Sequence, residues 1–283
     1  MNFEKIYSNF KDAYYTTNDL NPIDFSTDKK VSKYVKEDYI EEYNDVPYKV
    51  YVFWFGGPKD PIPIMSNNRK AALNSMKKNL GVDIIVITKE NLSQYITTPL
   101  HPAFKYLSGN HKSDYLRIYF LHHFGGGYSD IKFYNKSWRK AFNIINSTSR
   151  SHLYMIGTSL YGQNWVAHPK GMEWLKQYWR RLLSNGYFIM RKDTPLTREW
   201  FSKVNEILNN KLKLLRVFPS PSNRCCKPEE GQDKNYPIEW NELCGRILQP
   251  LQFKYIKNIL NALPRPSNSN YQNNSGGWHN KYL

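Results

Sequence analysis

An acid and a base three residues apart are the first candidates for chemistry in this sequence. Asp114 and Arg117 lie at the start of a helix that apolar and aromatic residues predict over residues 115–124. Side chains at i and i+3 are neighbours on a helix, so the two share a face. We expect Ser113 to be the N-cap, and Asp114 in the first turn would suit the helix dipole. Taken alone, this spacing is typical of a surface ion pair worth about a few tenths of a kcal/mol.

A second carboxylate follows a run of three glycines. Residues 125–127 end the predicted helix, and glycine allows positive φ and a close approach of the backbone to a ligand. The alternation of residues 128–133 predicts a strand, with Asp130 just inside it. The helix, turn and strand would therefore present a second acid beside Asp114 and Arg117.

The order of these residues resembles a known family of sugar-transferring enzymes. Lys-Ser-Asp-x-x-Arg, a helix's length, Gly-Gly-x-Tyr and an aspartate on a strand is similar to the core of glycosyltransferase family 32, the sugar-binding region with a DXD motif. It also resembles the related capsular polysaccharide synthesis proteins. The matching residues are Ser113, Asp114, Arg117, Gly125, Gly126, Tyr128 and Asp130. Lys132 stands where the family has its second aspartate.

The resemblance implies a reaction and a role for each residue. A sugar would move from a UDP- or GDP-sugar to a glycan or other hydroxyl acceptor, with retention of anomeric configuration and no protein nucleophile. Asp114 would accept hydrogen bonds from donor hydroxyls, Arg117 would hold the sugar beside the diphosphate, and Asp130 would face metal and phosphate. These three are the catalytic candidates. The same resemblance adds Gly126, Tyr128 and Lys132 to the donor site.

Lys132 leaves the cofactor open. The family binds Mn²⁺ or Mg²⁺, which acts as a Lewis acid on the diphosphate. Either Asp130 binds the ion with help from the diphosphate and another carboxylate such as Glu242, or the Lys132 ammonium replaces the charge of the metal. We favour the metal, with Asp130 and Glu242 as candidate ligands. Loss of the second aspartate also suggests an alternative function, a nucleotide-sugar or glycan-binding protein without catalysis.

A β-rich run that ends in two glycines predicts the first strand. Residues 48–55 have the composition of a buried strand. The end of the run resembles the Trp-Phe-Gly-Gly turn that lies beside the nucleotide base in the same family. Ligands of open α/β sheets bind outside the carboxyl ends of the strands. Phe53, Trp54, Phe55 and Gly56 are therefore donor-binding candidates, and a plain strand ending in a glycine turn is the alternative.

Strand and helix alternate through the first half of the chain. A basic amphipathic helix over residues 65–80 and a second buried strand over residues 82–88 follow the first strand. This β-α-β order predicts a parallel sheet. Pattern and resemblance together predict an α/β fold of the GT-A type, a Rossmann-like nucleotide-sugar-binding domain with a mostly parallel central sheet and additional C-terminal helices.

The second half of the chain gives weaker signals. The patterns predict a strand over residues 152–159 and helices over residues 138–145, 171–186, 197–214 and 238–248. Residues 164–171 resemble a family segment in which an asparagine precedes a strand. Asn164 is therefore a candidate ligand of the sugar or acceptor, although asparagine is also a common turn residue. By the same resemblance, Trp240 would close over the diphosphate.

Length and composition fit one large domain or a domain with an appended lobe. The 283 residues, 40% of them hydrophobic, can bury a full core. We expect an N-terminal extension over residues 1–45, the glycosyltransferase domain over residues 46–262 and a tail over residues 263–283. No apolar run reaches the roughly 18 residues that would span a bilayer, and no signal-peptide core precedes the domain. These observations predict a cytoplasmic protein, soluble or peripheral to a membrane.

A net charge of +16 points to anionic partners without choosing among them. Nucleotide diphosphates, anionic lipid headgroups, acidic glycans and nucleic acid would each fit it. Basic and aromatic residues interleave over residues 174–181, which would suit nucleic acid, but the sequence contains no recognised nucleic-acid-binding module. We expect a nucleotide-sugar donor, a glycan or lipid-linked acceptor and peripheral contact with an anionic membrane, and no nucleic acid.

Overall fold

The computed structural model describes residue 35 and residues 45–56, 64–220 and 235–267. All of the predicted N-terminal extension except residues 35 and 45, and most of the predicted tail, lie outside these residues, as do Gly57 and most of the loop before Tyr236. The domain boundaries therefore stay a prediction. Among the helices that the structure describes, none is both long enough and apolar enough to cross a bilayer.

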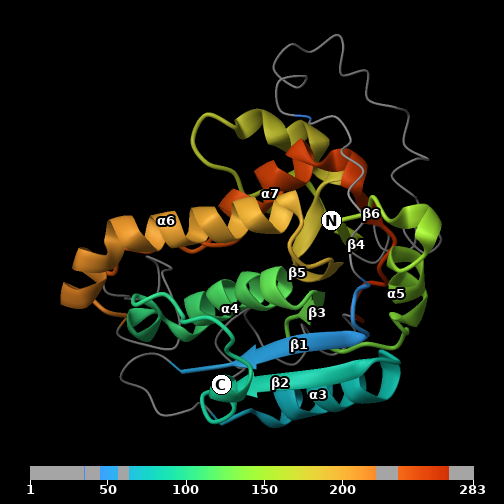
Figure 1. The fold of residues 1–283 in the computed structure, drawn as a ribbon, viewed down its shortest axis with the longest axis horizontal. Helices are drawn as coiled ribbons and strands as arrows, with labels where there is room; N and C mark the ends of the chain where they lie inside the picture. The colour runs from blue at the N-terminus through green and yellow to red at the C-terminus, as the bar shows by residue number, and fades with distance from the viewer. Residues whose placement is uncertain (1–34, 36–44, 57–63, 221–234, 268–283) are drawn as a thin grey trace, which may run out of the picture.

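A six-stranded sheet in the order β2-β1-β3-β5-β4-β6 forms the centre of the described chain. The strands are β1 (Lys49–Trp54), β2 (Asp83–Thr88), β3 (Gly126–Ser129), β4 (Met155–Ser159), β5 (Leu183–Met190) and β6 (Ile259–Asn261). β1 is parallel to β2 and β3, and β4 is parallel to β6, whereas β5 is antiparallel to both of its neighbours. Three of these five pairings are parallel, so the predicted α/β fold with a mostly parallel sheet is confirmed (Figure 1).

Helices cover both faces of the sheet. One face carries α3 (Asn67–Asn79) and α5 (Arg139–Ile145), and the other carries α4 (Gly109–His123), α6 (Pro195–Val217) and α7 (Gly245–Lys254). Successive side chains of a strand point to opposite faces. Accordingly, Val50 and Val52 of β1 join the core beside α3 and α5, whereas Tyr51 and Phe53 join the core beside α4. Figure 1 shows α4 between β1 and α6.

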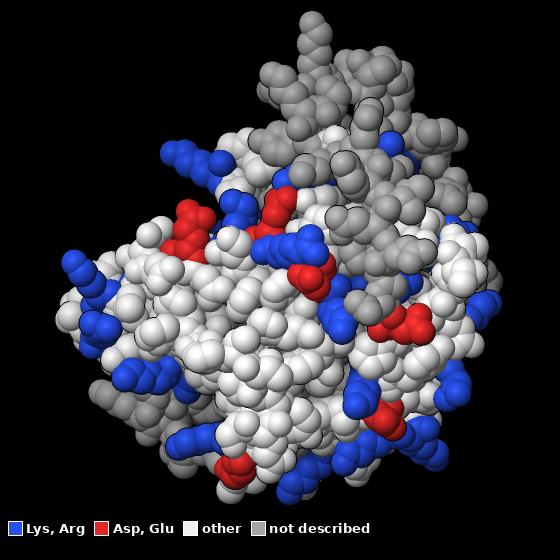
Figure 2. Space-filling view, in the orientation of Figure 1, with Lys and Arg blue, Asp and Glu red and all other residues white. Residues whose placement is uncertain are grey.

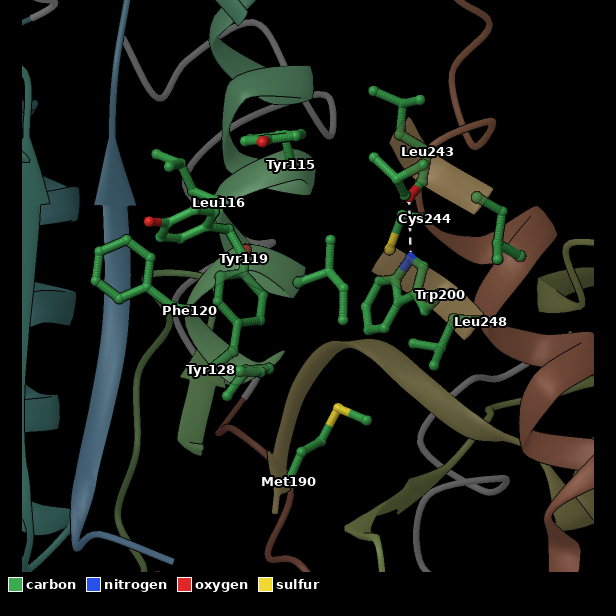
Figure 3. Close-up of a cluster of buried hydrophobic side chains, with 14 of the residues drawn as sticks. Tyr115, Leu116, Tyr119, Phe120, Tyr128, Met190, Trp200, Leu243, Cys244 and Leu248 are labelled. Carbon is green, nitrogen blue, oxygen red and sulfur yellow. Dashed lines mark hydrogen bonds between the residues drawn. The ribbon is translucent and has the colours of Figure 1, made fainter. Parts of the chain in front are cut away.

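The larger core cluster fixes α4 against α6 and α7. Tyr119 and Phe120 of α4, Trp200 of α6 and Leu248 of α7 are fully buried in it (Figure 3). The Trp200 indole donates a hydrogen bond to the Leu243 carbonyl at 3.1 Å. Each large apolar side chain buried in this way contributes about 1.5–3 kcal/mol. The helix that carries Asp114 and Arg117 is therefore held firmly over the sheet.

Two boundaries beside the candidate site differ from the prediction. The N-cap of α4 is Ser108, whose hydroxyl accepts the His111 N–H at 3.1 Å, and Ser113 lies inside the helix. Gly109 and Asn110 resemble a turn in sequence, which conceals this earlier start. β3 ends at Ser129, so Asp130 follows the strand instead of lying within it.

The helix predicted over residues 171–186 is wrong. A 3₁₀-helix, η5 (Glu173–Arg181), occupies the first part, and β5 begins at Leu183. β5 has hydrogen-bonded neighbours on both sides, and its last four residues are buried. Tertiary pairing thus overrides the helical spacing of the aromatic residues. Asn164 lies in another short 3₁₀-helix, η4 (Gln163–Trp165), and the strand predicted after it is not formed in this described region.

Candidate functional site

The candidate site lies where β1 and β3 end. The two strands are parallel, so their carboxyl ends reach the same edge of the sheet. Asp130 follows β3 at this edge, and α3 begins beyond β1, so that Arg69 in its first turn reaches the segment after β3. Nη1 of Arg69 donates to the Ile131 carbonyl at 2.7 Å. Edges of this kind are the usual ligand sites of α/β sheets.

Arg117 brings the three predicted catalytic residues together. Its Nη2 lies 3.0 Å from Asp114 Oδ1 and 3.8 Å from Asp130 Oδ1. The guanidinium also lies over the Tyr128 ring, 4.0 Å from the ring centroid. The arrangement of acid, base and second acid expected from the helix, turn and strand is present.

Protein groups enclose the Arg117 guanidinium. Nη2 donates to the Tyr128 hydroxyl at 2.7 Å. Nη1 donates to the Asn185 carbonyl at 2.6 Å and contacts Cys244 Sγ at 3.1 Å. With these partners Arg117 is buried, and its evident work is to position the two carboxylates. The direct hold on the sugar expected from the resemblance stays a prediction.

Tyr128 links the ends of β1 and β3. Its hydroxyl donates to Asp130 Oδ1 at 2.6 Å, and its ring stacks on Phe53 of β1 with centroids 5.7 Å apart. Phe53 and Tyr128 are both buried. These two donor-site candidates therefore have a structural role in the site, because the Phe53 ring packs on Tyr128 and the Tyr128 hydroxyl holds Asp130.

The two carboxylates have different electrostatic surroundings. The Asp114 side chain is only 13% exposed, and burial raises its pKa to about 6 although Arg117 opposes the shift. The Asp130 side chain is 37% exposed, and Lys132 Nζ lies 3.5 Å from its Oδ2. Burial opposes ionisation of Asp130, but Lys132, Arg117 and Arg69 lower its pKa below the ordinary value. At neutral pH Asp130 is therefore ionised, whereas the pKa of Asp114 lies much closer to the pH of the solution.

Gly186 of β5 leaves room for the Asp130 carboxylate. The Asp130 N–H donates to the Gly186 carbonyl at 2.8 Å, which extends the β3–β5 contact by one hydrogen bond. A Cβ atom on Gly186 would lie 2.9 Å from Asp130 Oδ2 and 3.6 Å from Lys132 Nζ. Sequence reasoning missed Gly186, since β5 was not predicted and no motif marks this glycine.

Lys112 is a second residue that sequence reasoning missed. It is buried, and its ammonium donates to the Gly56 carbonyl at 2.8 Å, which ties α4 to the turn after β1. In the same turn Phe55 packs edge-on against Phe104. Trp54, the last residue of β1, packs on the opposite face of the sheet. The one signal in the sequence that could have identified Lys112 is its position directly before Ser113 and Asp114 in the motif.

Gly126 lies away from this network. Gly125 and Gly126 have positive φ values of 68° and 107°, as the glycine run predicts. Gly126 is at the start of β3, and a Cβ there would lie 3.0 Å from the Lys49 carbonyl oxygen. Asp130 follows the other end of this four-residue strand, about 13 Å away at about 3.3 Å per residue. The glycine serves the close pairing of β3 with β1, and its role in donor binding stays a prediction without structural support.

The C-terminal segment before α7 packs against the start of α4. Both His111 ring nitrogens are engaged, Nδ1 with the Tyr236 hydroxyl at 2.8 Å and Nε2 with the Glu239 carbonyl at 3.2 Å. The helix predicted over residues 238–248 is wrong at its start, because α7 begins only at Gly245, and Trp240 therefore lies in the preceding turn, where it is exposed. Trp240 and the exposed Asn164 are not brought into contact with Asp130 by any described interaction, so their ligand roles stay predictions.

The residues present do not fit the expected metal site. Asp130 Oδ1 accepts the Tyr128 hydroxyl, and Oδ2 faces the Lys132 ammonium, which cannot bind a cation. Glu242 Oε1 is 2.5 Å from Lys211 Nζ, and Oε2 accepts the Glu239 N–H at 2.8 Å. Within residues 45–56, 64–220 and 235–267, no group of three or more His, Cys, Asp or Glu could hold a metal ion. Mn²⁺ and Mg²⁺ need several oxygen ligands. The metal expectation is therefore untested, and this donor set disfavours it.

The fold and the site together define an α/β protein with an acid-base cluster at the edge of its sheet. Residues 3–190 match the model of the family described as capsular polysaccharide synthesis protein. The chain belongs to this family, and the resemblance to it is confirmed.

Two further comparisons add little. Among solved structures, the PaToxG glycosyltransferase is similar to this chain at 14% sequence identity, with a TM-score of 0.35, over 79% of this chain and 71% of that one. This degree of similarity is too weak to support a conclusion about function. No curated protein matches the chain.

Proposed function

We propose that this protein is a glycosyltransferase that moves a sugar from a nucleotide sugar to a hydroxyl group of a glycan acceptor. The observation that carries the proposal is the network of Asp114, Arg117, Tyr128 and Asp130 at the edge where β1 and β3 end. Membership of a capsular polysaccharide synthesis family supports it, because polysaccharides are built by transfer of activated sugars.

Asp114 and Asp130 have separate roles in this proposal. Asp114, held by Arg117, accepts hydrogen bonds from hydroxyls of the donor. Asp130 is more exposed and lies beside the Lys132 ammonium, which suits the charged diphosphate end of the donor. Fixed polar groups of this kind lower the barrier by stabilising the charge that develops in the transition state. We further propose, from the family resemblance, a UDP- or GDP-sugar as donor and retention of anomeric configuration.

The turn after β1 is the proposed site of the nucleotide base. Its backbone is anchored by the Lys112 ammonium on the Gly56 carbonyl. Phe55 is half-buried against Phe104, so the turn has a defined shape. A preorganised backbone costs less entropy on binding than a mobile one. The turn is thus suited to hydrogen-bond a base through main-chain groups.

The acceptor and the cellular location of the protein are also proposals. The acceptor is a glycan or a lipid-linked glycan, with Asn164 as a candidate contact. The excess of basic residues supports peripheral contact with an anionic membrane. Figure 2 shows Lys and Arg spread around the face in view instead of gathered in one stripe, which agrees better with diffuse attraction than with a nucleic-acid groove.

Donor turnover tests the proposal. The full chain is assayed for transfer and hydrolysis with a panel of UDP- and GDP-sugars, with Mn²⁺, with Mg²⁺ and with EDTA. Asp114→Asn and Asp130→Asn should each reduce turnover by about 100-fold or more while the melting curve stays cooperative. Asp193→Asn is the matched control, because Asp193 forms an exposed ion pair with Arg198. Wild-type turnover by a folded Asp130→Asn protein would refute the assignment.

A nucleotide-sugar or glycan-binding protein without catalysis is the second candidate. Lys132, in the place of the family's second aspartate, is the observation that favours it. This function predicts saturable binding of a nucleotide sugar with neither hydrolysis nor transfer across the whole panel. Turnover that Asp130→Asn abolishes would exclude it.

A further inference from the structure

We propose that the fixed cations of Lys132 and Arg69, rather than a divalent metal ion, bind the diphosphate of the donor beside Asp130. This inference rests on the proposed function, because it concerns the donor of the proposed transfer. It assigns a binding role to Arg69, which no motif marks. It also explains the function of Lys132, the residue in the place of the family's second aspartate.

Three cations from three separate elements converge on Asp130. Lys132, in the segment after β3, lies 3.5 Å from Asp130 Oδ2, and Arg117 of α4 lies 3.8 Å from Oδ1. Arg69, in the first turn of α3, is held by the carbonyl of Ile131, the residue next to Asp130. The charge of Arg69 is near enough to contribute to the lowered pKa of Asp130. The Arg117 side chain is only 7% exposed, whereas that of Lys132 is 22% exposed and Arg69 is half-buried, so the proposal assigns the diphosphate to Lys132 and Arg69.

The charge balance at this edge suits a diphosphate. Three cations face two carboxylates, Asp114 and Asp130, so the cluster has a formal charge of 3 − 2 = +1 before the donor binds. Replacing an aspartate by lysine changes the charge at that position from −1 to +1. That change of two units equals the charge of the divalent ion that the second aspartate would help to hold. The same substitution removes a ligand for the ion and repels it.

The two cations can bind phosphate oxygens in complementary ways. A lysine ammonium is a compact charge with three donors, whereas a guanidinium presents a planar fork that matches two phosphate oxygens. Lys132 is partly buried between Asp130 and the Tyr187 ring, whose centroid is 5.7 Å from Nζ. Asp130 acts here as the residue that positions the ammonium, and Gly186 leaves the space that both need.

The proposed transfer step needs no further reactant. The bond between the anomeric carbon and the phosphate oxygen breaks, and the nucleoside diphosphate leaves with the electron pair. The acceptor oxygen forms the new bond to the anomeric carbon, and its proton passes to the departing phosphate oxygen. Lys132 and Arg69 stabilise the negative charge that grows on the diphosphate as the bond breaks.

Calorimetric titration of the full chain with UDP and with GDP, in EDTA and in Mn²⁺, tests the inference. At least one nucleotide should bind in EDTA within about twofold of its affinity in Mn²⁺. Lys132→Met and Arg69→Met should each weaken binding in EDTA by about tenfold or more, and Lys132→Arg should retain most of it. Lys136→Met is the matched control, because Lys136 is exposed four residues further along and its loss changes the net charge equally.

A variant that restores the family's Asp-x-Asp motif, Lys132→Asp, allows a second binding measurement. Lys132→Asp should lose binding in EDTA and recover part of it in Mn²⁺. Binding by the natural chain that requires Mn²⁺ and disappears in EDTA would overturn this inference and leave the proposed function standing. If neither nucleotide binds with or without metal and no donor is turned over, the proposed function fails as well.

Discussion

Substituting Gly186 tests whether the position of the Asp130 carboxylate matters to function. In Gly186→Ala the new Cβ would lie 2.9 Å from Asp130 Oδ2, whereas ordinary contacts begin at 3.4 Å. The carboxylate oxygen must therefore move by 3.4 − 2.9, or about 0.5 Å, and the Lys132 ammonium must adjust with it. Gly186 does not have a positive φ, so alanine adds no backbone strain.

The expected effect falls mainly on activity. The side chain that must move is a flexible end at the edge of the sheet, so the free energy of unfolding should fall by only about 1 kcal/mol. A misplacement of about 1 Å at a reacting centre costs about 100-fold in rate. Half that displacement corresponds to about tenfold in kcat/KM for the donor.

Steady-state assays of donor turnover and urea denaturation measure the two quantities on the same protein. Gly162→Ala is the control, because a Cβ there would meet its nearest neighbour, Trp165 Cδ1, only at 4.0 Å. Full activity of Gly186→Ala with unchanged stability would refute the reasoning, since the carboxylate would then be either displaced without consequence or irrelevant.

Two further predictions concern buried charges. Arg117→Met should lower the free energy of unfolding by about 3–5 kcal/mol, because it leaves Asp114 buried without its partner. Adding Asp114→Asn should recover part of the loss in urea denaturation, and simple additivity of the two effects would contradict the pairing. His111 should make the fold less stable in acid. Burial lowers its pKa from 6.5 to about 4, so the unfolded chain binds the proton first and stability falls as pH drops from about 6.5 toward 4. Between pH 7 and 5 this costs about 2 kcal/mol. Asp114 acts in the opposite direction, because its raised pKa of about 6 lets the folded state bind a proton more readily. The slope attributed to His111 should disappear in His111→Gln, and an unchanged slope would contradict the assignment.

Continuous apolar runs made the first half of the fold predictable. β1 and β2 are short runs of β-branched and aromatic residues, and α3 between them has helical spacing, so local pattern and final structure agree. β5 could not be found in this way. Its Ser-Asn-Gly segment reads as a turn, and only its pairing with β3 and β4 makes it a strand. β6 is three residues long and depends in the same way on β4.

The residues of the site also fall into those that local spacing predicts and those that it does not. Asp114, Arg117 and Asp130 are joined by one local helix-turn-strand unit, so their spacing in sequence was enough to predict that they meet. Arg69 and Gly186 reach the same carboxylate from α3 and β5, and no spacing rule connects them to it. Contacts between elements far apart in sequence can be recognised only after the sheet order is known.

The enclosure of Arg117 has a consequence for how specificity could change. The family match ends at residue 190, yet Cys244, directly before α7, contacts this guanidinium. Tyr236 is also close to the site: burial is the main cause that raises the pKa of Tyr236, and the negative charge of Asp114 adds to the shift. A substitution in the last quarter of the chain can therefore tilt or recharge the binding surface while every motif residue stays the same. New sugar preferences would then arise from a region that comparison of motifs does not inspect.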